Sequence, residues 1–237
     1  MTALVTAIRG GDVEALERQL RDHPEGAAAR IVDDRGVSRT LLHVAADWPG
    51  HFPNGPAIVA ALIRAGADVN APVEHPGPHG HAETALHWAA SSDDVAVLDA
   101  LLDGGADIEA PGAVFTFGTP MSDAVVFAQW RAARRLLERG AATTIWQAAA
   151  LGLLDRVQQC CAHLPPPTAD QVTNAFWHAC RGGQREVAEY LFERGADPNW
   201  VGYEYKTPLD VARDSGADGL MEWLLGIGAR PAAPSHR

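Results

Sequence analysis

The sequence predicts an all-α solenoid of about seven helix-turn-helix repeats with hairpin loops, in which the terminal repeats act as caps. Two recurring motifs predict this class of fold. One motif reads T-L-L-H-V-A-A, T-A-L-H-W-A-A or T-P-L-D-V-A, and its copies begin at Thr40, Thr84 and Thr207. The other reads G-A-D-V-N, G-A-D-I-E or G-A-D-P-N, and its copies begin at Gly66, Gly105 and Gly195. A leucine-rich segment follows each copy of the first motif, so every repeat is expected to hold a pair of helices.

Residues 83–109 show most clearly how one repeat is built. Thr84 occupies the N-cap position, where its hydroxyl can accept a hydrogen bond from an unpaired amide of the first turn. A short helix with a small apolar side follows, and Val95, Leu98 and Leu101 supply the apolar side of a second helix. Gly105 ends that helix, because glycine takes the left-handed conformation of a helix C-terminus at little cost. Neither helix can bury its apolar side alone, so the repeat requires neighbours.

The position of Thr84 recurs along most of the chain. The matching residues are Thr2, Thr40, Thr84, Thr119, Thr143, Asn174 and Thr207. Their spacings of 38, 44, 35, 24, 31 and 33 residues scatter around a period of about 33 residues. The sequence therefore resembles the ankyrin-repeat family over nearly its whole length. This resemblance implies a curved stack of helix pairs whose hairpin loops project to one side.

We expect one domain over residues 1–230 and a short flexible tail over residues 231–237. The expected repeats cover residues 2–36, 37–80, 81–117, 118–142, 143–172, 173–205 and 206–230. The prolines at 165–167 predict the end of a helix and a kink in the stack, since proline cannot continue a helix. A boundary between two domains at this point is the alternative, but the motif resumes directly after it, which favours continuity.

The composition indicates a folded protein with little affinity for nucleic acid. The chain has 237 residues, of which 47% are hydrophobic, and a formal net charge of −11. This acidic balance disfavours direct nucleic-acid binding, because lysine and arginine dominate affinity for the phosphate backbone. Lys206 is the only lysine, and the bias toward arginine suggests a bacterial source with a GC-rich genome.

Other features of the sequence favour a cytoplasmic location. No apolar run reaches the roughly 18 residues of a membrane-spanning helix, and the N-terminus lacks the layout of a signal peptide. The three cysteines, Cys160, Cys161 and Cys180, are an odd number with two adjacent members, which is not typical of a disulfide framework. We therefore expect a cytoplasmic monomer without a membrane segment.

Two insertions, at residues 49–54 and 71–83, interrupt the repeat pattern. The second contains His75, His79 and His81, and His51 lies in the first. Imidazole is a good zinc ligand, so a metal site is one interpretation of these residues. A solvated loop is the favoured interpretation, because a proline-rich segment gives the histidines no fixed direction and no cysteine is nearby. No metal or cofactor is expected.

The family resemblance assigns a structural role to His43 and His87. Both occupy the histidine position of the T-x-L-H motif, and in ankyrin repeats this histidine bridges to neighbouring backbone. Ser122 replaces it in repeat four, which puts the usual bond in doubt there. Trp146 and Trp177 are aligned with it in repeats five and six.

Aromatic and basic residues mark further surfaces. Phe115 and Phe117 are separated by one position, as are Tyr203 and Tyr205, so an extended hairpin arm would place each pair on one face. Arginines spaced by three and four positions predict either an exposed basic stripe on a helix of repeat four or simple solvated side chains. They are Arg131, Arg134, Arg135 and Arg139.

The leading hypothesis for function is a protein-protein interaction module that binds a partner protein through a concave groove and the hairpin tips. The resemblance implies this surface, and aromatic residues and arginine are the usual anchors of protein interfaces. The candidate binding residues are Asp47, Trp48, Ser91, Ser92, Phe115, Phe117, Phe127, Arg181, Tyr203 and Tyr205. The plain alternative is that the aromatic residues only fill irregular hairpins.

The second hypothesis is an enzyme or small-molecule binder with a pocket in the concave face, covered by the inserted loops around 49–54 and 71–83. Its polar groups would be Asp47, His51, His79, His81 and Tyr203. The sequence holds no P-loop, G-x-S-x-G, H-E-x-x-H or dinucleotide fingerprint, so no catalytic residue is assigned. A third hypothesis is regulation of a DNA-bound complex through protein contacts.

Overall fold

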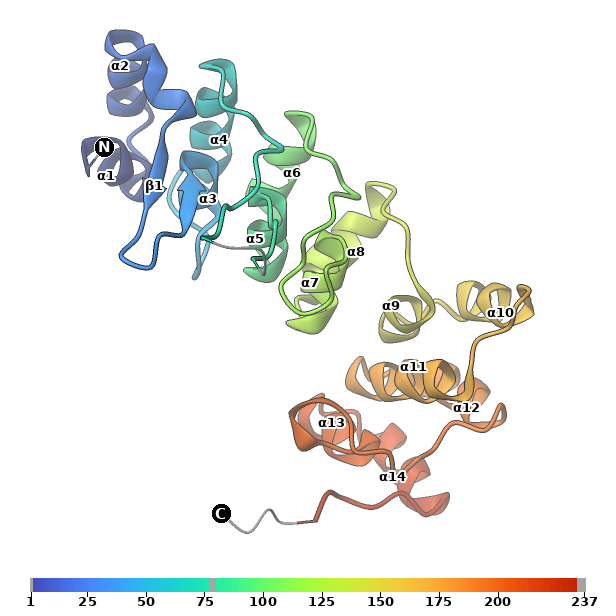
Figure 1. The fold of residues 1–237 in the computed structure, drawn as a ribbon. Helices are drawn as coiled ribbons and strands as arrows, with labels where there is room; N and C mark the ends of the chain where they lie inside the picture. The colour runs from blue at the N-terminus through green and yellow to red at the C-terminus, as the bar shows by residue number, and fades with distance from the viewer. Residues whose placement is uncertain (1, 77–79, 234–237) are drawn as a thin grey trace. The chain divides into compact units, whose positions relative to one another are not determined.

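The computed structural model describes residues 2–76 and 80–233. They form two compact units, Met1–Ala142 and Thr143–Arg237, and each unit is described by itself. Both units are built from pairs of short helices joined by tight turns (Figure 1). The prediction of an all-α solenoid is confirmed, whereas the expectation of one domain stays a prediction. In the described ranges, no helix has the length and apolar character needed to cross a membrane.

The described part of the first unit contains four helix pairs. They are α1 (Thr2–Gly10) with α2 (Val13–Asp22), α3 (Leu41–Ala46) with α4 (Gly55–Arg64), α5 (Ala85–Ser91) with α6 (Val95–Asp103), and α7 (Pro120–Val126) with α8 (Trp130–Glu138). A short 3₁₀ helix, η1 (Pro24–Ala28), follows α2. The core consists of small and branched apolar side chains, among them Ile8, Leu16, Leu42, Ile58, Leu86, Leu98 and Met121. Alanine recurs on the first helices, which lets neighbouring repeats approach closely.

The first hairpin contains a small two-stranded sheet, which the sequence did not predict, and a backbone bridge joins it to the second hairpin. Strands β1 (Arg30–Val32) and β2 (Ser38–Thr40) pair antiparallel, with Arg30 opposite Thr40. Ser38 also exchanges two backbone hydrogen bonds of 2.8 Å with Glu74, which lies in the second inserted loop. This loop is therefore held to the preceding hairpin by main-chain pairing.

The second unit contains three helix pairs in its described residues. They are α9 (Ile145–Ala150) with α10 (Leu154–Ala162), α11 (Ala169–Arg181) with α12 (Arg185–Phe192), and α13 (Pro208–Asp214) with α14 (Asp218–Gly226). A 3₁₀ turn, η2 (Tyr203–Tyr205), lies in the hairpin before α13. The core is centred on Phe176 and Trp177, which are at most 1% exposed. The Ala232 amide of the expected tail donates to Asp210 at 2.8 Å, while residues 234–237 lie outside the described ranges.

The predicted start of the first helix in repeat five is wrong by one residue. Thr144, not Thr143, caps α9, and Gln147 accepts the Thr144 backbone N–H at 2.7 Å. Gln147 therefore takes the histidine position that the sequence alignment gave to Trp146. The two adjacent threonines make the register ambiguous, and the T-x-x-Q pattern of a capping box favours the second.

The predicted start of the first helix in repeat six is also wrong. Helix α11 begins at Ala169 under a Thr168 cap, and Gln171 completes the capping box. Asn174 consequently lies inside the helix and caps nothing. The alignment by repeat period missed the additional turn because that turn has no counterpart in the other repeats.

One side-chain hydrogen bond links successive repeats in both units. The ring Nε2 of His43 lies 3.0 Å from the Glu83 carbonyl oxygen. His87 makes the corresponding contact with Gly118 at 3.4 Å. In the second unit the indole Nε1–H of Trp177 donates to the Lys206 carbonyl at 2.9 Å. Each carbonyl belongs to the residue before the threonine cap of the next repeat, so the bridge implied for the histidines is confirmed and tryptophan retains it.

The same histidines also complete the caps of their own helices. The backbone N–H of Thr40 donates to Nδ1 of His43, and that of Thr84 donates to Nδ1 of His87. Nδ1 must be unprotonated to accept this hydrogen bond. The ring proton is therefore on Nε2, which donates it in a hydrogen bond to the carbonyl oxygen of the next repeat. Burial of the rings lowers the pKa of both histidines to about 4. Each ring is thus held neutral in the fold.

Stability should fall on the acid side of neutrality because of these histidines. Their ordinary pKa is 6.5, so below that pH the unfolded chain binds protons that the folded chain refuses until about pH 4. Near pH 5 the loss is about 2 kcal/mol for each ring. Urea unfolding should therefore show that the free energy of unfolding falls less between pH 7.5 and pH 5 in His43→Gln than in the wild type.

His23 supplies the control for this measurement, because its side chain is 75% exposed. His23→Gln should lose as much stability as the wild type over the same pH range. Equal pH dependence in His43→Gln and the wild type would contradict the assignment of a neutral buried ring.

Candidate functional site

The first inserted loop, residues 49–54, is packed between the helix-to-helix turns of the neighbouring repeats. The backbone N–H of His51 donates to the carboxylate of Asp94 at 2.6 Å. The side-chain amide of Asn54 donates to the Gly11 carbonyl at 2.9 Å. Asp94 is 2% exposed and also caps α6 through the Val97 N–H. The loop is therefore engaged with the turns of repeats one and three.

Two candidate binding residues at the end of α5, Ser91 and Ser92, are less exposed than expected because of this packing. Ser92 is buried against Gly50, which is a correction to its expected position on the surface. Ser91 is half-buried, and its hydroxyl donates to the Trp88 carbonyl at 3.0 Å. Neither hydroxyl is presented freely to a partner.

The candidates at the end of α3 behave differently from each other. Asp47 forms an ion pair of 3.2 Å with Arg9. Trp48 directly precedes the inserted loop and is 80% exposed. Trp48 is thus a free aromatic surface, whereas the Asp47 charge is partly neutralised.

The second inserted loop brings two of its histidines together. The rings of His75 and His81 are 6.3 Å apart and perpendicular, and His81 also lies 5.1 Å from the ring of Phe117. His79 is outside the described residues. Among the residues that are described, no group of three metal-binding side chains converges. Tyr203, another polar group of the small-molecule hypothesis, belongs to the second unit, whereas Asp47, His51 and His81 belong to the first.

The hairpin over residues 110–118 presents exposed phenylalanines. Its tip is a turn closed by the Phe117 N–H, which donates to the Ala113 carbonyl at 2.8 Å. Phe115 is 68% exposed and Phe117 64% exposed. Phe115 lies 5.9 Å from Phe127 at the end of α7, while Phe117 lies against His81. The expectation that the pair shares one face of an extended arm is wrong, because the turn sends each ring to a different neighbour.

One buried and one partly buried carboxyl group lie near this hairpin. Asp123 is 1% exposed, and its Oδ2 has no hydrogen-bond partner among the described residues. Burial, with the nearby Glu83 carboxylate, raises the pKa of Asp123 to about 8. Burial also raises the pKa of Glu83. Asp123 is therefore largely protonated at neutral pH, which removes the cost of an unpaired buried charge.

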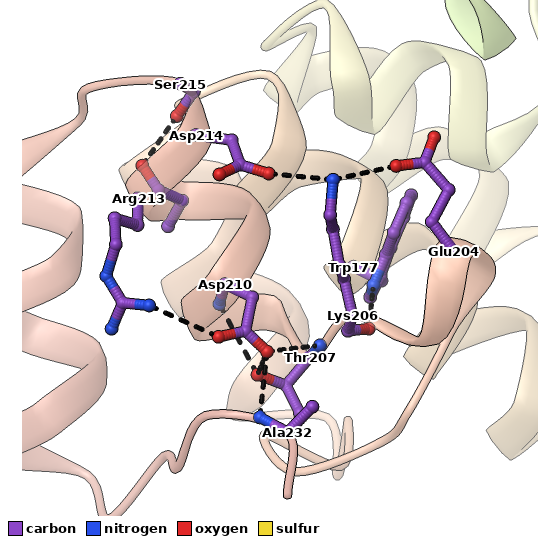
Figure 2. Close-up of polar contacts among 10 residues, drawn as sticks. Trp177, Glu204, Lys206, Thr207, Asp210, Arg213, Asp214, Ser215 and Ala232 are labelled. Carbon is purple, nitrogen blue, oxygen red and sulfur yellow. Dashed lines mark hydrogen bonds and ion pairs between the residues drawn. The ribbon is translucent and has the colours of Figure 1, made fainter. Parts of the chain in front are cut away.

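The hairpin before α13 is held by the single lysine of the chain (Figure 2). The Lys206 ammonium lies 2.8 Å from Glu204 and 3.0 Å from Asp214. Tyr203 packs on Trp177 and is half exposed, whereas Tyr205 is 86% exposed.

The backbone of this hairpin also differs from the expected extended arm. Glu204 and Tyr205 both have positive φ, at 57° and 58°. The expected pairing of Tyr203 and Tyr205 on one face is therefore wrong. Arg181, the remaining candidate in this unit, is half-buried, with its guanidinium 5.8 Å from the ring of Trp177.

The expected basic stripe on α8 is largely neutralised. Arg135 and Arg139 both lie 2.8 Å from Asp99 on α6, and Arg139 also pairs with Asp103. Arg131 is 3.8 Å from Asp93. Arg135 and Arg139 therefore connect α8 to the second helix of the preceding repeat, and Arg131 reaches the turn before that helix.

The comparisons with known proteins agree with this architecture. The Ankyrin repeat family model matches residues 38–73 and 82–113. An ankyrin repeat and KH domain-containing protein of Caenorhabditis briggsae is 31% identical over 183 residues, which is 73% of this chain and 7% of that protein. The crystal structure of the human ASB11 ankyrin repeat domain superposes with a TM-score of 0.52 at 22% identity, covering 97% of this chain and 99% of that one. The chain is an ankyrin-repeat protein.

Ankyrin repeats are generally protein-protein interaction modules, and the two relatives supply no further assignment. The chain spans about 7% of the length of the nematode relative. The structural likeness shows the fold.

The second unit contains a pocket that the sequence did not predict. It has a volume of about 600 Å³ and lies between α9, α11 and the hairpin that carries Trp200. Asp170 and Gln171 line it from the additional turn of α11. The T-x-x-Q box at Thr168 is the sequence signal that would have placed these residues on a helix.

Asp94 should contribute more to stability than a helix cap that makes no loop contact. Asp94→Ala removes the α6 cap and the hydrogen bond that the Asp94 carboxylate accepts from the part-buried His51 N–H, at an expected cost of about 3 kcal/mol. Asp12→Ala is the matched control, because Asp12 caps α2 through Ala15 alone at 2.9 Å. Its expected cost is about 1 kcal/mol in urea unfolding. Equal losses in the two variants would show that the inserted loop does not depend on Asp94.

Proposed function

We propose that the chain binds a partner protein through an aromatic surface of its first unit. This surface consists of Phe115 and Phe117 on the hairpin over residues 110–118, with Phe127 at the end of α7. The observation that carries the proposal is the exposure of both hairpin phenylalanines, at 68% and 64%. The ring of Phe115 lies 5.9 Å from that of Phe127, which is 41% exposed. Exposed aromatic side chains that stand together in this way favour an interaction site over simple surface variation.

The backbone that carries this surface is held in one conformation. The N–H groups of Gly112 and Ala113 both donate to the Gly118 carbonyl, at 2.8 and 3.0 Å. Gly112 has a φ of 134° and lies against the backbone of Ala82, where no side chain would fit. The rings therefore need little further ordering on binding, and a smaller entropic cost favours affinity.

Two other groups of candidates extend the proposal. Trp48 follows α3, as Phe127 follows α7, so both stand at the ends of first helices. In the second unit, Arg181, Tyr203 and Tyr205 offer a separate aromatic and basic surface. The expected concave groove across the repeats, the monomeric state, the cytoplasmic location and the bacterial source stay predictions from the sequence.

The small-molecule hypothesis has weaker support than protein binding. Its two inserted loops are engaged in packing, one with Asp94 and the other with β2. Stabilisation by a metabolite without any protein partner would favour it, because ligand binding raises the free energy of unfolding.

Removal of the hairpin aromatics should abolish partner capture without unfolding the protein. Phe115→Ala combined with Phe117→Ala should weaken the captured complex by about 30-fold or more, as expected for aromatic interface anchors. The measurement is pull-down from a native lysate, followed by titration of the captured partner. Leu225→Ala on α14 is the control, since Leu225 is 59% exposed and lies outside the proposed surface. Undiminished capture by the double variant, with an unchanged melting temperature, would remove this hairpin from the binding site.

A further inference from the structure

The pocket in the second unit is an arrangement specific to repeats five and six. Helix α11 has 13 residues, whereas the other first helices have between six and nine. Its additional turn follows the proline-containing segment at 163–168. Because Asp170 and Gln171 stand on that turn, they form a wall that the other repeats lack.

Two tryptophans line the pocket, and each is supported by another aromatic ring. Trp146 at the start of α9 lies 4.6 Å from His178, and Trp200 lies 6.0 Å from Tyr203. His178 is buried, and burial lowers its pKa to about 3, so it brings no positive charge beneath Trp146. Both tryptophans are half-buried, with surface left available to a ligand.

Several polar groups in the pocket are already used within the unit. The Asn174 amide donates to the Tyr203 hydroxyl at 2.9 Å, and the Thr173 hydroxyl oxygen accepts the Asp197 N–H at 3.2 Å. Gln171 accepts the Thr168 N–H at 2.9 Å. These bonds fix the walls and reduce the number of donors offered to a ligand.

Among the residues that the structure describes, Asp170 is the one charged residue that lines the pocket. Within the described ranges, its carboxylate has neither a hydrogen bond nor an ion pair. A negative group beside two indole rings is complementary to a flat cation, because ring faces attract positive charge and a carboxylate accepts paired N–H donors. The same carboxylate opposes the binding of an anion.

We propose that this pocket binds the guanidinium group of an arginine side chain on a partner protein. The inference rests on the proposed protein-binding function and assigns a second, chemically defined contact to it. The indole rings of Trp146 and Trp200 contact the guanidinium, and Asp170 accepts its N–H groups. Arginine fits better than lysine, since its planar group both stacks on rings and pairs with a carboxylate in bidentate fashion.

The chain itself uses the same pairing elsewhere. The guanidinium of Arg39 lies 5.9 Å from the ring centroid of Trp88, and that of Arg194 lies 3.4 Å from the ring centroid of Tyr190. Each pair is intramolecular. The pocket offers rings and a carboxylate, and no arginine within residues 2–76 and 80–233 lines it.

The test is a titration of the isotope-labelled full chain with N-acetyl-arginine amide, followed by NMR. The indole N–H signals of Trp146 and Trp200 should shift in a saturable manner at millimolar probe. N-acetyl-citrulline amide, which has a similar shape without the charge, should bind at least tenfold more weakly, as should N-acetyl-lysine amide. Equal binding by citrulline or lysine, or no shift with any probe, would overturn the assignment of a guanidinium site.

Matched variants separate the role of the carboxylate from its position on the helix. Asp170→Asn should weaken arginine binding at least fivefold. Glu186→Gln should leave it unchanged, because Glu186 is likewise the second residue of its helix, α12, but does not line the pocket. Equal affinities in the two variants would contradict the proposal.

This test also distinguishes the pocket from the aromatic surface of the first unit. The variant lacking Phe115 and Phe117 should retain the arginine-induced shifts in full. Partner capture that is lost in that variant but insensitive to Asp170→Asn would leave the proposed function standing and remove the pocket from it.

Discussion

The stack depends on a hydrogen bond that passes from the first helices α3, α5 and α11 to the backbone of the repeat that follows each of them. Helices of six or seven residues are too short to be stable alone, so their order must come from their neighbours. In the first unit one imidazole performs two tasks. Nδ1 of His43 or His87 closes the cap of its own helix, and Nε2 holds the carbonyl that precedes the next cap. Trp177 retains only the second task, through its indole N–H.

The repeated motifs were sufficient to predict the helix pairs and the bridging histidines, because both depend on local spacing. The ends of the irregular repeats could not be read from the period. Thr144 and Thr168 each begin a T-x-x-Q capping box, and this local signal outweighs the alignment. The small sheet of the first hairpins was also missed, since strands of three residues carry almost no pattern of their own.

The directions of the aromatic side chains in the hairpins could not be predicted from the sequence. Alternation of Phe115 and Phe117 implies a shared face only in an extended strand, and the tight turn sends the rings to different neighbours. The contribution of Asp94 could not be foreseen, because it depends on an inserted loop that folds back across two repeats. Side-chain surroundings in this protein are thus decided by tertiary packing, while the repeat scaffold is decided locally.

The central claim is that the bridging imidazoles are neutral and carry their proton on Nε2. Long-range ¹H–¹⁵N correlation spectra of the histidine rings test it directly. The structure requires His43 and His87 to show the Nε2–H tautomer, with Nδ1 unprotonated, and to remain neutral at pH 6. Nδ1–H tautomers, or imidazolium signals at pH 6 for the two buried rings, would contradict this account of how the repeats are joined.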